Sequence, residues 1–185
     1  MIIGARRGRP TSRFNGPARA LLPLRRCAWR WASNDAWKSL TMDQKQVSDK
    51  GGTIAGYVWD YAGKMELMRY FWDAAVELDP SAAKLDEGTR FPLCRPEALE
   101  NLFADAGLKG IEVKPIDIPT RFTNFDDYWQ PFLGGQGPAP GYAMALDETV
   151  RARLRDRIRA RIPIAANGSI SLTARAWASR ATVAE

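Results

Sequence analysis

Gly51 and Gly52 begin the stretch that limits the possible folds of this chain more than any other. The run that follows, residues 53–59, is almost wholly apolar and shows no alternation of apolar and polar side chains. Such a run after a turn predicts a strand buried on both faces, as in the middle of a parallel sheet covered by helices. Asp60 and Tyr61 then place polar groups at the carboxyl end of the strand, where open α/β sheets bind their ligands. The sequence therefore predicts an α/β fold with a ligand site beside Asp60.

The basic charge of the chain is confined to its N-terminal part. Residues 1–40 carry nine basic residues and one acidic residue, a net charge of +8, whereas residues 41–185 carry 18 basic and 20 acidic residues, a net charge of −2. Three prolines, Pro10, Pro17 and Pro23, prevent a long helix in the basic part. We therefore expect residues 1–47 to be an Arg-rich leader, irregular or disordered, that does not fold with the body of the protein.

Three origins of the leader remain open. An Arg-rich and acid-poor segment is typical of an organelle transit peptide, although serine is scarce here. Aromatic residues among the arginines could make it an arm that binds nucleic acid by stacking: Phe14, Trp29, Trp31 and Trp37. A shifted reading frame or a wrong start in GC-rich coding DNA would also give this composition, and we favour that explanation.

The residue composition excludes several classes of site. The chain contains no histidine, which argues against a hydrolase triad and against a histidine-based metal site. Cys27 and Cys94 are too few for a disulfide framework and suit a reducing cytoplasm. No apolar run approaches the roughly 18 residues of a membrane-spanning helix. These observations predict a cytoplasmic protein without a metal site.

After Gly63 the apolar residues recur at helical spacing. Residues 64–79 are predicted to be a helix that ends at Pro80, with an apolar face made of Met65, Met68, Phe71, Trp72, Ala75 and Val76. Residues 81–94 are predicted to be a loop. Pro96 at a first helical position and Gly107 at a C-cap predict a second helix over residues 95–107. Residues 111–118 then predict a strand, which Pro115 places at a sheet edge or a bulge.

Residues 123–165 are predicted to be an inserted, lid-like segment. Aromatic residues stand beside the glycine- and proline-rich run 134–141, which suits either a lid over a pocket or a packed insertion. Asp147 is the predicted N-cap of a helix over residues 148–162. Because alternate residues step about 200° around a helix, its six arginines fan out, which favours a solvated face over a nucleic-acid surface. Residues 169–178 alternate as a last strand, predicted to pair antiparallel with residues 111–118, and residues 181–185 form a tail.

This order of elements resembles the C-terminal half of a class I S-adenosylmethionine-dependent methyltransferase, from about Gly51 to Arg180. The Gly51-Gly52 turn is similar to the one before the fifth strand of that family. Ala106-Gly107-Leu108 is similar to the end of the helix before the sixth strand. Residues 111–118 and 170–178 match the sixth and seventh strands, which form a reversed pair. The runs 57–61 and 132–138 are similar to a bacterial subgroup that methylates small molecules.

The resemblance implies a partial Rossmann-like methyltransferase sheet in residues 48–180, with equivalents of strands five, six and seven under covering helices. It also implies transfer of a methyl group to a small-molecule acceptor, an in-line displacement that depends on positioning and water exclusion. Asp60 and Tyr61 are the candidate catalytic residues, although Asp60 suits a strand-end cap equally well. Aromatic candidates for the wall of an acceptor pocket, where a ring face could attract the sulfonium, are Trp59, Tyr61, Tyr70, Phe91, Trp129 and Phe132.

The family's cofactor fingerprint, a Gly-x-Gly-x-Gly loop followed by an acidic residue that holds the ribose, has no counterpart in this sequence. We therefore identify no cofactor-binding residue and expect a truncated chain. S-adenosylmethionine is the cofactor implied by the family, and we expect this chain alone to bind it poorly or not at all.

Two other functions stay open. The first is a non-catalytic subunit that completes its sheet with another chain, because the missing fourth strand would leave one flank of residues 53–59 open to self-association. The second is nucleic-acid binding through the basic leader, for which the near-neutral body offers no continuing basic surface.

Overall fold

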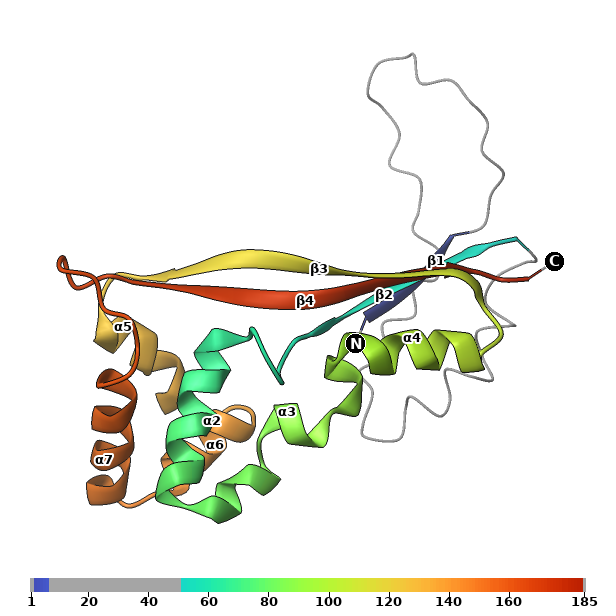
Figure 1. The fold of residues 1–185 in the computed structure, drawn as a ribbon. Helices are drawn as coiled ribbons and strands as arrows, with labels where there is room; N and C mark the ends of the chain where they lie inside the picture. Colours follow the sequence, from blue (N-terminus) through green and yellow to red (C-terminus); the bar gives the residue numbers. More distant parts are fainter. Residues whose placement is uncertain (1, 7–50, 185) are drawn as a thin grey trace. The chain divides into compact units, whose positions relative to one another are not determined.

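The computed structural model describes residues 2–6 and 51–184 of the chain (Figure 1). The strands are β1 (Ile2–Arg6), β2 (Thr53–Trp59), β3 (Lys109–Phe122) and β4 (Ile170–Thr182). The α-helices are α2 (Glu66–Leu78), α3 (Glu87–Arg90), α4 (Pro96–Asp105), α5 (Phe125–Trp129), α6 (Pro138–Ala145) and α7 (Glu148–Arg159). Three short 3₁₀ segments are η1 (Pro80–Lys84), η2 (Pro92–Cys94) and η3 (Gln130–Leu133). Among these described helices, none is long and apolar enough to cross a membrane.

The four strands form one sheet in the order β1-β2-β4-β3. Strand β1 runs antiparallel to β2, with Ile2 opposite Tyr57. The backbone bonds Val183 N to Gly52 O and Asp60 N to Arg175 O show that β2 and β4 run in opposite directions. Ion pairs Arg180–Glu112 and Arg175–Asp117 show the same for β4 and β3. The predicted α/β class is confirmed, but neighbouring strands are antiparallel and their order is not Rossmann-like.

The prediction that residues 53–59 form a strand is confirmed, but the prediction that both faces are buried is wrong. Ile54 and Val58 are buried, whereas Thr53, Ala55 and Tyr57 are exposed. An antiparallel sheet commonly buries one face only, so alternate residues of a strand are covered. The small residues Ala55 and Gly56 make the sequence look uniformly apolar although half of the strand faces water.

Strand β1 pairs along the flank of β2 that the sequence analysis expected to be open. This pairing differs from the expectation because Ile2–Arg6 supplies the neighbouring strand from within the predicted leader. The remainder of that leader, residues 7–47, lies outside the described residues.

The chain divides into two compact units, each with its own buried side chains. Unit 1 comprises the described parts of Met1–Val58, Leu99–Lys114 and Ala178–Glu185, and unit 2 comprises Trp59–Ala98 and Pro115–Trp177. The buried apolar residues of unit 1 are Ile54, Val58, Leu99, Leu102, Phe103, Leu108 and Ala181. Strands β3 and β4 each contribute residues to both units.

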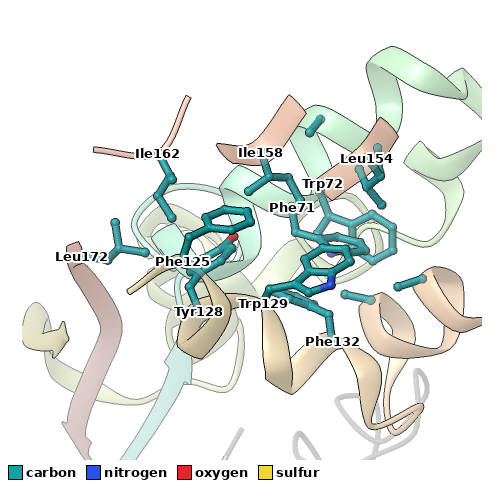
Figure 2. Packing of buried hydrophobic residues seen from close by; sticks show 14 of the residues in the cluster. Phe71, Trp72, Phe125, Tyr128, Trp129, Phe132, Leu154, Ile158, Ile162 and Leu172 are labelled. Atoms are coloured by element: carbon teal, nitrogen blue, oxygen red, sulfur yellow. The ribbon is translucent and has the colours of Figure 1, made fainter. Parts of the chain in front are cut away.

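The core of unit 2 is a hydrophobic cluster whose buried aromatic rings come from α2, α5 and η3, with aliphatic side chains from α7 packed against them (Figure 2). Phe71 lies at its centre, with its ring centroid 4.5 Å from that of Phe132 and 6.5 Å from that of Trp129, both in stacked arrangements. The Tyr128 hydroxyl donates to the Leu67 carbonyl at 2.9 Å, so this buried hydroxyl is satisfied. The predicted insertion 123–165 therefore packs its aromatic residues into this core.

Several local predictions are confirmed. Helices α2 and α4 occupy the predicted stretches, and Gly107 ends the latter with a φ of 75°. Strand β3 is an edge strand, as Pro115 indicated. The Asp147 carboxylate accepts a hydrogen bond from Val150 N at 2.9 Å and caps α7.

The structure differs from the sequence prediction at two further boundaries. The predicted loop 81–94 contains η1, α3 and η2, and β4 runs to Thr182, into the predicted tail 181–185.

Four of the six arginines in residues 148–162, on α7 and directly after it, form ion pairs within unit 2. Arg155 pairs with Asp126, and Arg157 and Arg161 both pair with Glu77 of α2. Arg151 pairs with Glu148 one turn earlier. These ion pairs agree with the predicted solvated face, because their carboxylate partners offset the positive charge that nucleic acid would need.

Candidate functional site

The polypeptide that leaves β2 makes a tight turn before α2, and Asp60 organises this turn. The Asp60 side chain is 6% exposed, and its Oδ2 accepts a hydrogen bond from Lys64 N at 3.0 Å. Its carbonyl oxygen accepts from the backbone nitrogens of Gly63 and Met65. A Cβ at position 63 would lie 2.8 Å from Asp60 Oδ2, so a larger residue there would push the carboxylate out of this position. Asp60 thus fills the capping role that the sequence analysis held open.

Arg69 of α2 joins this turn to α3. Its guanidinium donates to Asp86 at 2.8–3.0 Å, to Asp73 at 2.7 Å and to the Tyr61 carbonyl at 3.0 Å. The side chains of Arg69 and Asp86 are only 17% and 10% exposed, whereas that of Asp73 is 60% exposed. Burial alone would lower the pKa of Arg69, but the hydrogen bonds to Asp86 and Asp73 outweigh it and raise the pKa. The guanidinium is therefore a fixed positive charge between two carboxylates.

Beside this arginine lies an open, polar cleft of about 370 Å³. It is lined by residues from the turn after β2, from α2 and from the α3 region: Ala62, Gly63, Arg69, Asp73, Asp86, Gly88, Thr89 and Arg95. Small-molecule sites in proteins commonly measure about 300–1,000 Å³, and this cleft falls at the lower end. All of its lining residues belong to unit 2.

Gly88 allows α3 to approach closely to the turn after β2. A Cβ there would lie 2.7 Å from the Tyr61 carbonyl oxygen and 3.0 Å from Ala62 Cα. Both neighbours are backbone atoms, so a larger residue would push α3 away from the turn after β2. Asp86 Oδ1 also accepts from Gly88 N at 2.8 Å and caps α3.

A second, buried group of ionisable side chains lies next to the cleft. Glu87 is 5% exposed, and its Oε2 accepts a hydrogen bond from Trp72 Nε1 at 2.5 Å. Burial raises the pKa of Glu87, and the charge of Asp86 adds to this effect. Burial also raises the pKa of Tyr61, with smaller contributions from Glu87 and Cys94. Cys94 is buried, and burial raises the pKa of its thiol.

The structure brings some of the predicted site residues together and separates others. Tyr61 and Phe91 are neighbours, with ring centroids 6.2 Å apart. Trp129 and Phe132 are 6% and 1% exposed and belong to the aromatic core of unit 2. Tyr70 is half-buried and packs against the same core, and Trp59, also half-buried, ends β2.

Sequence reasoning missed the residues that line the cleft. Arg69 and Asp73 stand one helical turn apart, a spacing that favours an ion pair. Asp86 precedes Glu87 as an acidic residue does at a helix N-cap. These local signals were present, but nothing in them shows that the two segments meet.

The residues of this region do not fit the cofactor that the family resemblance implies. The turn after β2 holds one glycine, Gly63, which lies against Asp60 rather than opening a glycine-rich loop, and the printed sequence has no Gly-x-Gly-x-Gly run. Among residues 2–6 and 51–184 there is no cluster of three or more His, Cys, Asp or Glu side chains that could hold a metal ion. No protein-family model and no curated protein matches the chain.

Proposed function

We propose that the chain serves S-adenosylmethionine-dependent methyl transfer to a small molecule and that it supplies the acceptor side of the site. The observation that carries this proposal is the position of the polar cleft. It begins at Ala62 and Gly63, directly after the carboxyl end of β2, which is where the family resemblance leads us to expect the ligand.

The order of the helices and strands along the chain supports the proposal. The Gly51-Gly52 turn precedes β2, α4 ends at Gly107, and β3 and β4 are neighbouring strands of opposite direction. Each of these local features is the one expected for the fifth strand, the following helix or the reversed sixth and seventh strands of the family, although the order of the strands in the whole sheet is not Rossmann-like.

The roles of the residues follow from their contacts. The Arg69–Asp86 pair and Gly88 hold the cleft wall in place, and Thr89 offers a hydroxyl to a ligand. Tyr61 and Phe91 are neighbours of each other but are not among the residues that line the cleft. Positioning an acceptor against such a wall and excluding water are the contributions that a methyl transfer needs from its acceptor side. Because the residues do not fit the cofactor, we assign no step to a cofactor group.

Neither alternative is favoured by the described contacts. A partner chain that adds a strand beside β2 would have to displace β1. Nucleic-acid binding through the basic leader concerns residues that lie, apart from Ile2–Arg6, outside the described part of the chain. The body offers no continuing basic surface on α7, because Arg155 and Arg157 pair with the carboxylates of Asp126 and Glu77.

Calorimetry on the full chain tests the proposal. Phenol, aniline, benzylamine, benzoate and 4-aminobutanoate are titrated separately, followed by S-adenosylmethionine. We expect at least one of the five small molecules to bind with one-to-one stoichiometry and S-adenosylmethionine to show no binding at micromolar concentration.

A matched pair of variants assigns the binding to the cleft. Thr89→Trp should block it, whereas Thr149→Trp on the exposed surface of α7 should not. The proposal is contradicted if none of the five compounds binds, if Thr89→Trp leaves binding unchanged, or if S-adenosylmethionine binds stoichiometrically at micromolar affinity.

A further inference from the structure

The charges that line the cleft are of both signs. The lining contains two arginines, Arg69 and Arg95, and two aspartates, Asp73 and Asp86, and is otherwise small or neutral. The cleft thus carries no excess of one charge, and neither a simple anion nor a simple cation is matched to the whole of it.

Asp73 is the carboxylate of the cleft that can accept a further hydrogen bond from a ligand. Both carboxylate oxygens of Asp86 accept hydrogen bonds from Arg69, and Oδ1 also accepts one from Gly88 N. Asp73 gives Oδ1 to Arg69, and its side chain is 60% exposed. Since Arg69 is shared by two carboxylates, the three groups together retain one negative charge, and Asp73 presents it to solvent.

The positive group is Arg95, which lies in an extended conformation between η2 and α4 and is exposed. A guanidinium binds a carboxylate through two parallel N–H donors. Thr89 and the backbone of Gly63 and Gly88 supply further polar surface in the same lining. The two sides of the charge pattern therefore suit an ammonium group at Asp73 and a carboxylate at Arg95.

We propose that the cleft binds a small zwitterion, an amino acid or a compound that carries an amino-acid group, with its ammonium on Asp73 and its carboxylate on Arg95. This inference rests on the proposed function only for the ligand's role as methyl acceptor, because binding is measured without methyl transfer. The cleft volume of about 370 Å³ limits the ligand to a small molecule.

Titration of the full chain with matched probes tests the charge pattern. Glycine, 4-aminobutanoate and 6-aminohexanoate vary the distance between the charges, while butanoate and butylamine keep the chain length and remove one charge each. We expect at least one of the three amino acids to bind tenfold or more tightly than both singly charged probes, because it makes a charge-assisted contact at each end whereas each probe makes only one. Added salt should weaken this binding.

Two variants assign the charges. Asp73→Asn should reduce binding of the preferred amino acid to the level of the carboxylate probe, and Arg95→Gln should reduce it to the level of the amine probe. Arg153→Gln and Asp156→Asn, exposed positions on α7, are the matched controls and should leave binding unchanged. Thermal unfolding of each variant confirms that it is folded.

The inference is overturned if the amino acids bind no more tightly than the singly charged probes, or if Asp73→Asn and Arg95→Gln leave binding unchanged. If phenol or aniline occupies the cleft and no amino acid does, the zwitterion inference fails while the acceptor-side proposal stands. If an amino acid binds and S-adenosylmethionine also binds at micromolar affinity, the acceptor-side proposal fails while the zwitterion inference stands.

Discussion

Arg69 holds three segments together, and its contacts differ in their expected energy. The Asp86 carboxylate is 10% exposed and would lose its charged partner if Arg69 were removed. We predict that Arg69→Ala lowers the free energy of unfolding by about 2–3 kcal/mol, because a largely buried carboxylate would remain without a counter-ion. Arg69→Lys should recover little of this loss, since an ammonium cannot reproduce the guanidinium fork. Urea denaturation measures both variants.

Asp73→Asn is the control for this prediction. Its pair with Arg69 is exposed and spans one helical turn, so its loss should cost only about 0.5 kcal/mol. Equal losses for Arg69→Ala and Asp73→Asn would show that the Asp86 contact is not the stronger one.

Glu87 gives a pH dependence whose sign follows from its burial. Its pKa in the folded protein is raised above the ordinary value of 4.5, first of all by burial. The folded protein therefore retains a proton that the unfolded chain loses, and stability falls as the pH rises from about 4.5 through the raised pKa. Glu87→Gln keeps an oxygen for Trp72 Nε1 and has no charge. We predict that the variant gains stability relative to the parent as the pH rises over this range, measured by urea denaturation at several pH values. A constant difference between the two proteins would contradict the burial effect.

Among the helices, α7 depends on its first turn. Asp147 accepts from Val150 N, and Glu148 adds a second acidic residue at the positive end of the helix dipole. We predict that Asp147→Ala lowers the free energy of unfolding by about 1 kcal/mol. Asp156→Ala, an exposed position within the same helix, should change it by less than about 0.5 kcal/mol. Thermal unfolding measures both variants. A smaller effect at Asp147 than at Asp156 would contradict the claim that the Asp147 cap stabilises α7.

Substitutions of the predicted aromatic residues distinguish a role in the core from a role in a pocket wall. Phe132 is 1% exposed and stacks on Phe71, so Phe132→Ala should cost about 3–5 kcal/mol through lost contacts and a cavity. Phe91 is half-buried beside Tyr61, and Phe91→Ala should cost about 1–2 kcal/mol. If Phe132→Ala left stability unchanged and altered ligand binding, the pocket-wall prediction would be the better one.

The elements that sequence predicted well are those specified by local chemistry. Gly107 needs a positive φ at the end of α4, Pro115 suits an edge strand, and Asp147 caps its own helix. The burial of β2 could not be predicted, because Ala55 and Gly56 fit a buried or an exposed face equally well. Aromatic residues such as Trp129 and Phe132 give the same sequence signal in a core as in a pocket wall. Only the tertiary packing shows which of the two they belong to. The cleft was missed because Arg69 and Asp86, 17 positions apart, meet only when α3 packs against the turn after β2.

At the scale of the whole molecule, the antiparallel sheet leaves neither flank of β2 open to a strand from another chain. Strand β4 lies between β2 and β3, and β1 covers the remaining flank of β2. The polar turn after β2 opens into a cleft of mixed charge, whereas the glycine loop of a cofactor site has no counterpart in the printed sequence. This contrast is the basis of our proposal that the chain binds the acceptor and not the cofactor.

The most direct test of this assignment is a ¹H–¹⁵N amide spectrum of the full chain, recorded during titration with the tightest-binding small molecule from the calorimetric series. We predict that the largest shifts fall on the amides of Gly63, Gly88 and Thr89, and that they are lost in Thr89→Trp. Shifts confined to residues outside the cleft, or no shifts at saturating ligand, would contradict a binding site at the end of β2.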